Sequence, residues 1–143
     1  MHSFVCALIH FTFSTKDRRP LIRPEFQPRL WEFMGGVSRD NGAVALAIGG
    51  VEDHVHLLLS LSANASIARV MQEVKAGSSK FMHETFTPDF DWQDGYGAFS
   101  IGASQREHTV AYIRNQKEHH KKRSFEEEFR ALCRLYGVEL IAA

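Results

Sequence analysis

The chain has 143 residues, of which 44% are apolar, and its 17 basic residues balance 17 acidic ones. This length fits one domain with a hydrophobic core, so we expect a single domain over residues 1–143. The neutral charge argues neither for nor against a nucleic-acid partner. The absence of a run of about 18 apolar residues excludes a membrane-spanning helix, and without a basic, apolar leader we expect a cytoplasmic protein whose Cys6 and Cys133 are free thiols.

The spacing of apolar residues predicts alternating strands and helices along the chain. The first half of the chain should form a strand over 4–14, a helix from Pro24 to about Asn41, and strands over 43–48 and 53–61 joined at Gly49-Gly50. A helix capped by Ser66 and a strand over 98–102 follow. Two last helices should begin at the S-x-x-E capping boxes of Ser104 and Ser124. The last helix should turn Phe129, Leu132 and Leu135 inward. This order is typical of a ferredoxin-like α+β fold, in which β-α-β-β-α-β forms an antiparallel sheet with helices on one face, here with further C-terminal helices.

Two histidines stand one residue apart in the third predicted strand, D-H-V-H-L-L-L-S-L over residues 53–61. Because strand side chains alternate between faces, Val55 shares an apolar face with three leucines, and His54 and His56 lie together on the opposite face, off the main core. Imidazoles at this spacing can converge on one metal ion. The alternative is a pair of half-exposed strand histidines satisfied by water or a backbone carbonyl.

A third ligand can come from the helix predicted after Ser104. Helix positions three or four apart share a face, so Tyr112 and Gln116 lie together, and His108 and His119 fall on the same stripe. Gln116 offers a carbonyl oxygen as a ligand, and Tyr112 offers a phenol oxygen that can attack. The alternative is an ordinary amphipathic helix with a half-buried tyrosine.

Four short motifs resemble those of one family. D-H-V-H-L-L-L is similar to the histidine-hydrophobic-histidine motif of the HUH endonucleases, and Y-I-R-N-Q-K-E-H-H to a single catalytic tyrosine followed four residues later by glutamine. F-S-T-K-D-R-R-P-L-I and W-Q-D-G-Y-G-A-F-S also resemble that family. Together, over about residues 4–138, the chain resembles the insertion-sequence-200-like single-tyrosine transposases.

The resemblance implies a metal-dependent transposase that cleaves and rejoins single-stranded DNA, which is a role in DNA transposition and recombination. It makes Tyr112 the catalytic nucleophile and His54, His56 and Gln116 the ligands of a divalent metal, Mg²⁺ or Mn²⁺. The fold it implies is the same ferredoxin-like one. The partners it implies are single-stranded DNA, as hairpin ends, and a second copy of the chain in a homodimer.

The expected chemistry needs a base and a cation. Tyrosine is a weak nucleophile at its ordinary pKa of about 10, and His108 or His119 is the candidate base here. A divalent ion polarises the phosphoryl oxygens, and imidazole ligands favour Mn²⁺. The product would be a 5′-phosphotyrosine and a free 3′-hydroxyl, and attack by a different 3′-hydroxyl would rejoin strands without ATP.

Local basic clusters are the expected DNA contacts, because such side chains bind phosphates electrostatically and without regard to sequence. The candidates are Lys16, Arg18, Arg19, Lys75, Lys80, Arg114, Lys117 and Lys121. Aromatic side chains could add base stacking. Phe86 and Phe90 are the candidates for that role, whereas Trp92 is expected to be structural.

Three other functions are compatible with these residues. A host-retained relative would bind and nick repeated hairpins without mobility. A small zinc hydrolase would use His54 and His56 with His119 or His120, which makes Tyr112 dispensable. A nucleic-acid-binding module on the same sheet would bind DNA and never cleave it.

Overall fold

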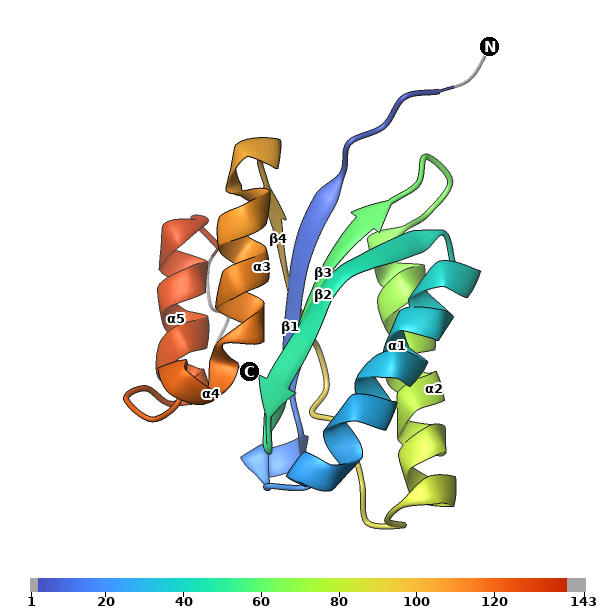
Figure 1. The fold of residues 1–143 in the computed structure, drawn as a ribbon, viewed down its shortest axis with the longest axis vertical. Helices are drawn as coiled ribbons and strands as arrows, with labels where there is room; N and C mark the ends of the chain where they lie inside the picture. The colour runs from blue at the N-terminus through green and yellow to red at the C-terminus, as the bar shows by residue number, and fades with distance from the viewer. Residues whose placement is uncertain (1–2, 139–143) are drawn as a thin grey trace.

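A computed structural model describes residues 3–138, which form a four-stranded antiparallel sheet with helices on both faces (Figure 1). The strands are β1 (Leu8–Ser14), β2 (Ala43–Val51), β3 (His54–Leu61) and β4 (Gly97–Ile101), in the sheet order β2-β3-β1-β4. The chain order β-α-β-β-α-β confirms the predicted α+β class. No helix within these residues combines the length and the apolarity that crossing a bilayer requires.

Two long helices cover one face of the sheet and enclose the main core. They are α1 (Gln27–Asp40) and α2 (Ile67–Thr85), and short 3₁₀ turns, η1 (Lys16–Arg18) and η2 (Pro24–Phe26), precede α1. Phe11 and Leu57 of the sheet pack in this core with Leu30 and Met71 of the helices. The predicted cap of α2 is confirmed, because the Ser66 side chain accepts a hydrogen bond from the backbone N–H of Arg69.

The C-terminal helices cover the opposite face of the sheet (Figure 1). They are α3 (Arg106–Arg114), α4 (Gln116–His119) and α5 (Phe125–Leu135). Leu58 of β3 and Ile113 of α3 belong to a small second core between them. The prediction that His54 and His56 lie off the main core is confirmed, since neither belongs to it. The alternative of half-exposed histidines is wrong, because the C-terminal helices bury both side chains fully.

Two strand boundaries differ from the prediction because pairing, and not apolarity, decides where a strand ends. β1 begins at Leu8, which pairs with Ser60 and Ile101, whereas Phe4 is 95% exposed. Gly49-Gly50 lies inside β2 and not in the turn, since Val51 still pairs with His54.

The predicted starts of the last two helices have different outcomes. Ser104 lies inside a 3₁₀ turn, η3 (Ala103–Gln105), and α3 begins only at Arg106, so the predicted cap is wrong there. The Ser124 cap is confirmed, because its side chain accepts from the N–H of Glu127. The inward stripe of α5 is wrong at Leu135, which is 76% exposed.

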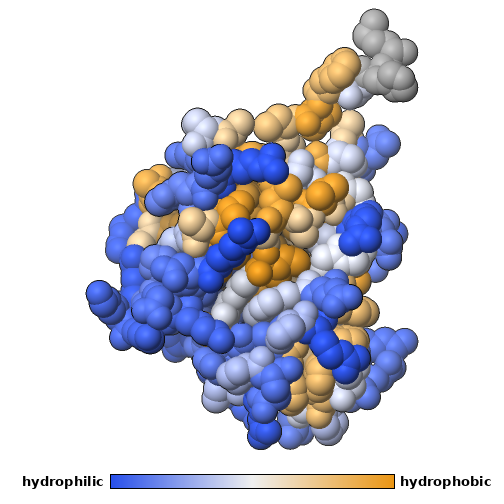
Figure 2. Space-filling view, viewed as in Figure 1, coloured by the Kyte–Doolittle hydropathy of each residue, from blue (hydrophilic) through white to orange (hydrophobic). Residues whose placement is uncertain are grey.

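Phe86 and Phe90, the two residues proposed for base stacking, are used in packing, and the structural role predicted for Trp92 is confirmed. Phe90 and Trp92 are buried in the main core, and Phe86 stacks on Phe26 with ring centroids 4.1 Å apart. Exposed apolar side chains gather elsewhere. Figure 2 shows them over the region of the edge strand β2, where Val44 is 58% exposed.

A glycine allows α3 to approach the sheet closely. Gly49 of β2 is the cross-strand partner of His56, and a Cβ atom built on it would lie 2.5 Å from the backbone oxygen of Ile113 in α3. A real Cβ atom does not approach a backbone oxygen so closely. The missing side chain at Gly49 therefore sets how near α3 lies to the buried histidines.

We predict that Gly49→Ala destabilises the fold by about 1–3 kcal/mol, the usual cost of overpacking, because α3 must move away from β2. Gly36→Ala is the matched control: Gly36 lies inside α1 with nothing within 4 Å of its added Cβ, so the substitution should stabilise by roughly 0.5–1 kcal/mol. Chemical denaturation measures both, and equal effects on the free energy of unfolding would contradict the proposed contact.

Candidate functional site

The central strand β3 places two histidines against the C-terminal helices. His54 pairs with Ser14 of β1, and His56 pairs with Thr12 of the same strand and with Gly49 of β2. Both imidazoles are fully buried on the face opposite the main core. The sheet thus fixes the backbone of both residues from both sides and aims their side chains at the C-terminal helices.

His54 has an acceptor oxygen beside each ring nitrogen, and a neutral ring can donate to only one of them at a time. Its Nδ1 lies 2.7 Å from Asp53 Oδ1, and its Nε2 lies 3.1 Å from Gln116 Oε1. The Gln116 amide nitrogen in turn donates to the backbone oxygen of Tyr112 at 3.3 Å, which fixes the direction of the carbonyl. The fold thus brings Gln116 beside His54, although the predicted continuous helix is interrupted at Asn115 between α3 and α4.

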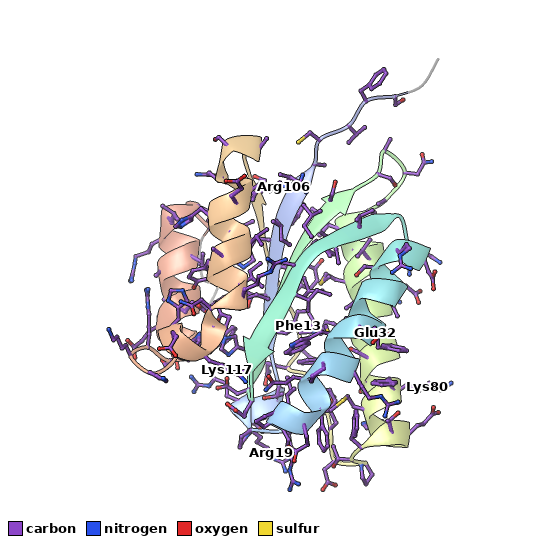
Figure 3. All side chains as sticks on the ribbon, viewed as in Figure 1. Phe13, Arg19, Glu32, Lys80, Arg106 and Lys117 are labelled. Carbon is purple, nitrogen blue, oxygen red and sulfur yellow. The ribbon has the colours of Figure 1, made fainter. Side chains whose placement is uncertain are left out.

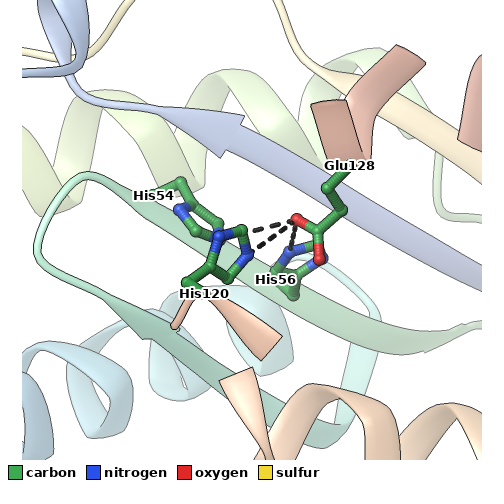
Figure 4. Close-up of side chains that lie close together, drawn as sticks. All are labelled: His54, His56, His120 and Glu128. Carbon is green, nitrogen blue, oxygen red and sulfur yellow. Dashed lines mark hydrogen bonds and ion pairs between the residues drawn. The ribbon is translucent and has the colours of Figure 1, made fainter. Parts of the chain in front are cut away.

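A buried carboxylate from α5 meets the histidines at the centre of the site (Figure 4). Oε1 of Glu128 lies 2.8 Å from Nε2 of His56, 3.6 Å from Nε2 of His54 and 3.2 Å from Nε2 of His120. Glu128 is 2% exposed. One oxygen atom therefore contacts three imidazoles that come from β3 and from the residue after α4.

These four side chains could hold a divalent metal ion. The ligand atoms of His54, His56, His120 and Glu128 all lie within 4.8 Å of one another. The approach of His120 to Glu128 is too poorly aligned for a hydrogen bond, so Nε2 of His120 is buried without a hydrogen-bond partner among the described residues. A buried ring nitrogen without a partner, beside two more imidazoles and a carboxylate, suits a divalent transition metal.

The hydroxyl of Tyr112 reaches the same carboxylate from α3. It donates a hydrogen bond to Oε2 of Glu128, whereas the imidazole distances given above are to Oε1. His119 packs its ring against Tyr112, with centroids 4.5 Å apart, but neither His119 nor the exposed His108 hydrogen-bonds the hydroxyl within the described residues. The phenol and the cluster are therefore joined through Glu128, within one chain.

Burial and charge act in opposite directions on the groups at this centre. Burial alone would raise the pKa of Glu128, but contacts with His120 and His56 outweigh it and hold that pKa far below its usual range. Burial raises the pKa of Tyr112, and the Glu128 carboxylate raises it further. The pKa of His120 rises because Glu128 more than offsets its burial. The resting site thus contains an anionic Glu128 and a protonated phenol.

Two residues outside the cluster contact its two strand histidines at Nδ1, the ring nitrogen that does not face Glu128. Nε2 of His10, on β1, lies 2.8 Å from Nδ1 of His56, and burial lowers the pKa of His10 to about 3. Burial would raise the pKa of Asp53, but its hydrogen bond with His54 lowers it. Each strand histidine therefore has a partner on the ring nitrogen that points away from Glu128.

Some of the predicted DNA-binding side chains gather beside the cluster and others do not. Arg18, Lys117 and Lys121 line an open groove of about 610 Å³ that also contacts Asp53 and His120. The remaining candidates lie elsewhere. Lys16 lies beside Asp91, Arg19 is exposed after η1, and Lys75 donates to the backbone oxygens of Gln93 and Gly95. Arg114 lines a separate groove on α3, and Lys80 lies on α2, across the sheet from Lys117 (Figure 3).

The sequence-based prediction missed Glu128 and considered His120 only as an alternative zinc ligand. One signal was available for Glu128. Positions 125, 128, 129 and 132 form one helical stripe, and Glu128 is the single acid in a stripe that is otherwise Phe125, Phe129 and Leu132. This signal is weak, because acidic residues are common in the first turn of a helix.

Comparisons with known proteins identify relatives of the chain. A family model described as "Transposase IS200 like" matches residues 4–116. A protein from Deinococcus radiodurans R1, whose crystal structure is named as that of a candidate transposase, is 23% identical with a TM-score of 0.65, covering 81% of this chain and 95% of its own. A REP-associated tyrosine transposase bound to a REP hairpin is 21% identical with a TM-score of 0.58, covering 79% and 68%. None of the functionally curated proteins compared with the chain matches it.

We predict that Mn²⁺ stabilises the wild-type protein, by about 2.7 kcal/mol when the free ion is 100-fold above its Kd, and that Glu128→Gln loses most of this gain. The substitution removes one anionic ligand atom from the cluster. Glu126→Gln is the matched control, since Glu126 is an exposed carboxylate of the same helix that pairs with Arg18 and Arg130. Thermal unfolding with and without Mn²⁺ measures the shift, and an equal loss in both variants would count against the assigned ligands.

Proposed function

Because this chain belongs to the IS200-like transposase family, we propose that it cleaves and rejoins single-stranded DNA through a covalent bond to Tyr112. The observation that carries the proposal is the contact between Tyr112, Glu128 and the imidazoles of His54 and His56 within one chain. A nucleophile, a carboxylate and a cation site are thereby held together before substrate binds, which is the arrangement that lowers the entropic part of a reaction barrier.

The proposed metal ligands begin with His54 and His56. Gln116 and Glu128 supply the nearest oxygen atoms, at 3.1 Å from Nε2 of His54 and 2.8 Å from Nε2 of His56, and His120 supplies a third imidazole. Mg²⁺ or Mn²⁺ is the proposed ion, and the imidazole-rich set favours Mn²⁺. When bound, the ion would polarise the phosphoryl oxygens of the DNA.

In the proposed reaction the Tyr112 oxygen attacks the phosphorus of one phosphodiester. The phenol proton passes to Glu128, its hydrogen-bond acceptor, in place of the His108 or His119 base expected from the sequence. Because the pKa values of the resting site hold the proton on the phenol, this transfer accompanies the formation of the oxygen–phosphorus bond. A bond forms between Tyr112 and the 5′-phosphate while the bond from phosphorus to the 3′ oxygen breaks, and the leaving oxygen takes the proton from Glu128 to become a free 3′-hydroxyl. Attack by another 3′-hydroxyl, which gives its proton to Glu128, reverses these bonds and rejoins the strands, and Glu128 then returns a proton to Tyr112.

The proposed substrate is a DNA hairpin with an unpaired flank. The structural relative bound to a REP hairpin supports this choice, and the groove lined by Arg18, Lys117 and Lys121 gives the backbone a path to the cluster. A homodimer is also proposed, with the apolar surface over β2 as its support (Figure 2). The site does not need a partner for its assembly, since all its residues come from one chain.

We predict that Tyr112→Phe still binds a single-stranded hairpin but forms no covalent adduct, because the attacking oxygen is gone. With Mn²⁺ and wild-type protein, a 3′-labelled hairpin should transfer its label to the protein band, and a 5′-labelled one should not. The phosphate stays with the fragment on the 3′ side of the cut, which explains this asymmetry.

Tyr96→Phe is the matched control, since Tyr96 is 39% exposed and packs near Phe11 on the other face of the sheet. It should form the adduct at the wild-type rate. An adduct in Tyr112→Phe would overturn the assignment of the nucleophile. Full cleavage without any adduct would favour the metal hydrolase, and binding without cleavage at any Mn²⁺ or Mg²⁺ concentration would favour the binding module.

We predict that the double variant Lys117→Ala, Lys121→Ala weakens hairpin binding and flattens its salt dependence. Each phosphate that the protein no longer neutralises should reduce the slope of log K against log salt by about 0.7 for single-stranded DNA. The ion pair of Lys121 with Glu118, 3.0 Å apart, is exposed and contributes little to stability, so the fold should be unaffected. Lys80→Ala, on α2, should leave both the affinity and the slope unchanged.

A further inference from the structure

We propose that His10 is a positioning residue that prepares His56 to bind the metal ion by accepting the proton on its Nδ1. This inference rests on the proposed metal site. His10 lies on β1, 3% exposed, and its Nε2 is 2.8 Å from Nδ1 of His56. The contact joins neighbouring strands of the sheet and forms the only side-chain hydrogen bond of His10 among the described residues.

The direction of the hydrogen bond between His10 and Nδ1 of His56 depends on whether Nε2 of His56 carries a proton or binds the metal ion. A neutral imidazole has one N–H donor and one acceptor. A metal ligand must offer a lone pair, so binding through Nε2 requires the proton of His56 to be on Nδ1. Nδ1 then donates, and Nε2 of His10 must accept, which places the proton of His10 on its own Nδ1. Partners of this kind fix the tautomer and the ring orientation of ligand histidines.

Without a metal the same pair adopts the reverse arrangement. Nε2 of His56 then donates to Oε1 of Glu128, 2.8 Å away. A neutral His56 must therefore accept at Nδ1, and His10 donates to it from Nε2. His10 satisfies both states because an imidazole can either donate or accept at the same atom.

The neighbouring strand histidine is held differently. Nδ1 of His54 faces Oδ1 of Asp53 at 2.7 Å, and an ionised carboxylate only accepts. Asp53 thus keeps the His54 proton on Nδ1 in either state, whereas the His10 contact lets His56 change tautomer as the ligand at Nε2 changes. His10 also lines a cavity of about 230 Å³ beside Tyr112 and Glu128. Within residues 3–138, Nδ1 of His10 is not one of the side-chain atoms that are both buried and without a hydrogen-bond partner. Its free nitrogen can therefore be solvated in both arrangements.

The test compares two variants of the full chain by their affinity for Mn²⁺, measured by electron paramagnetic resonance at one pH. His10→Phe fills the space but can neither accept nor donate, and it should weaken Mn²⁺ binding by roughly 10- to 100-fold, the usual effect of losing such a partner. His10→Gln offers a carbonyl oxygen or an amide N–H to Nδ1 of His56, and it should restore affinity to near that of the wild type. A purely structural role would lower the unfolding temperature of the metal-free variant and leave the Mn²⁺ affinity of the folded protein unchanged.

A second measurement needs no variant at His10. Nitrogen-15 spectra of the wild-type histidine rings, recorded without metal and with the diamagnetic ion Zn²⁺, should show the proton of His10 on Nε2 in the first case and on Nδ1 in the second. A proton that stays on Nε2 with the ion bound, or unchanged Mn²⁺ affinity in folded His10→Phe, overturns the role of His10 alone. A wild-type protein that binds neither ion overturns the metal site itself and this inference with it.

Discussion

The polar side chains on one face of the sheet are buried from water, so they must form hydrogen bonds with other groups of the protein. The rest of the site follows from that requirement. Thr12, His10, His54 and His56 lie on this face and are all buried. A buried polar group without a hydrogen bond costs several kilocalories per mole. Thr12 donates to the backbone oxygen of Val55, and the two imidazoles of β3 find Gln116 and Glu128 on the C-terminal helices.

The same requirement explains how α5 is held. Few of its side chains are fully buried, namely Glu128 and Cys133, and Leu135 points to solvent. The carboxylate of Glu128 is therefore a main attachment of this helix to the sheet. At the outer end, Glu126 pairs with Arg18 at 2.7 Å, but that contact is about half exposed and stabilises much less.

The C-terminal segment adds two side chains to the cluster beyond the part of the chain that the family model matches. The family match ends at residue 116, whereas His120 and Glu128 follow it in the sequence and complete the cluster. In the proposed reaction Glu128 faces the imidazoles with one oxygen and the Tyr112 hydroxyl with the other. A single carboxylate can thus couple the position of the nucleophile to that of the cation, and the close approach of α3 at Gly49 keeps both within reach.

The sequence by itself determined the elements and the two faces of the sheet. Period-two alternation in β3 separates Val55 and Leu57 from His54 and His56, and the serine caps of α2 and α5 are local signals that need no tertiary information. The pairing of Tyr112 with Gln116 also follows from local spacing. These features could be predicted because the interactions that specify them join residues close together in the chain.

Only the tertiary structure decided what covers the histidines. The contacts of His56 with Glu128 and with His10 join residues 72 and 46 positions apart, and no local pattern encodes such a pairing. An acid in the first turn of a helix usually faces water and favours the helix dipole, so Glu128 resembled an ordinary surface residue until α5 folded onto the sheet. Burial, which depends on the whole chain, turned that residue into the centre of the site.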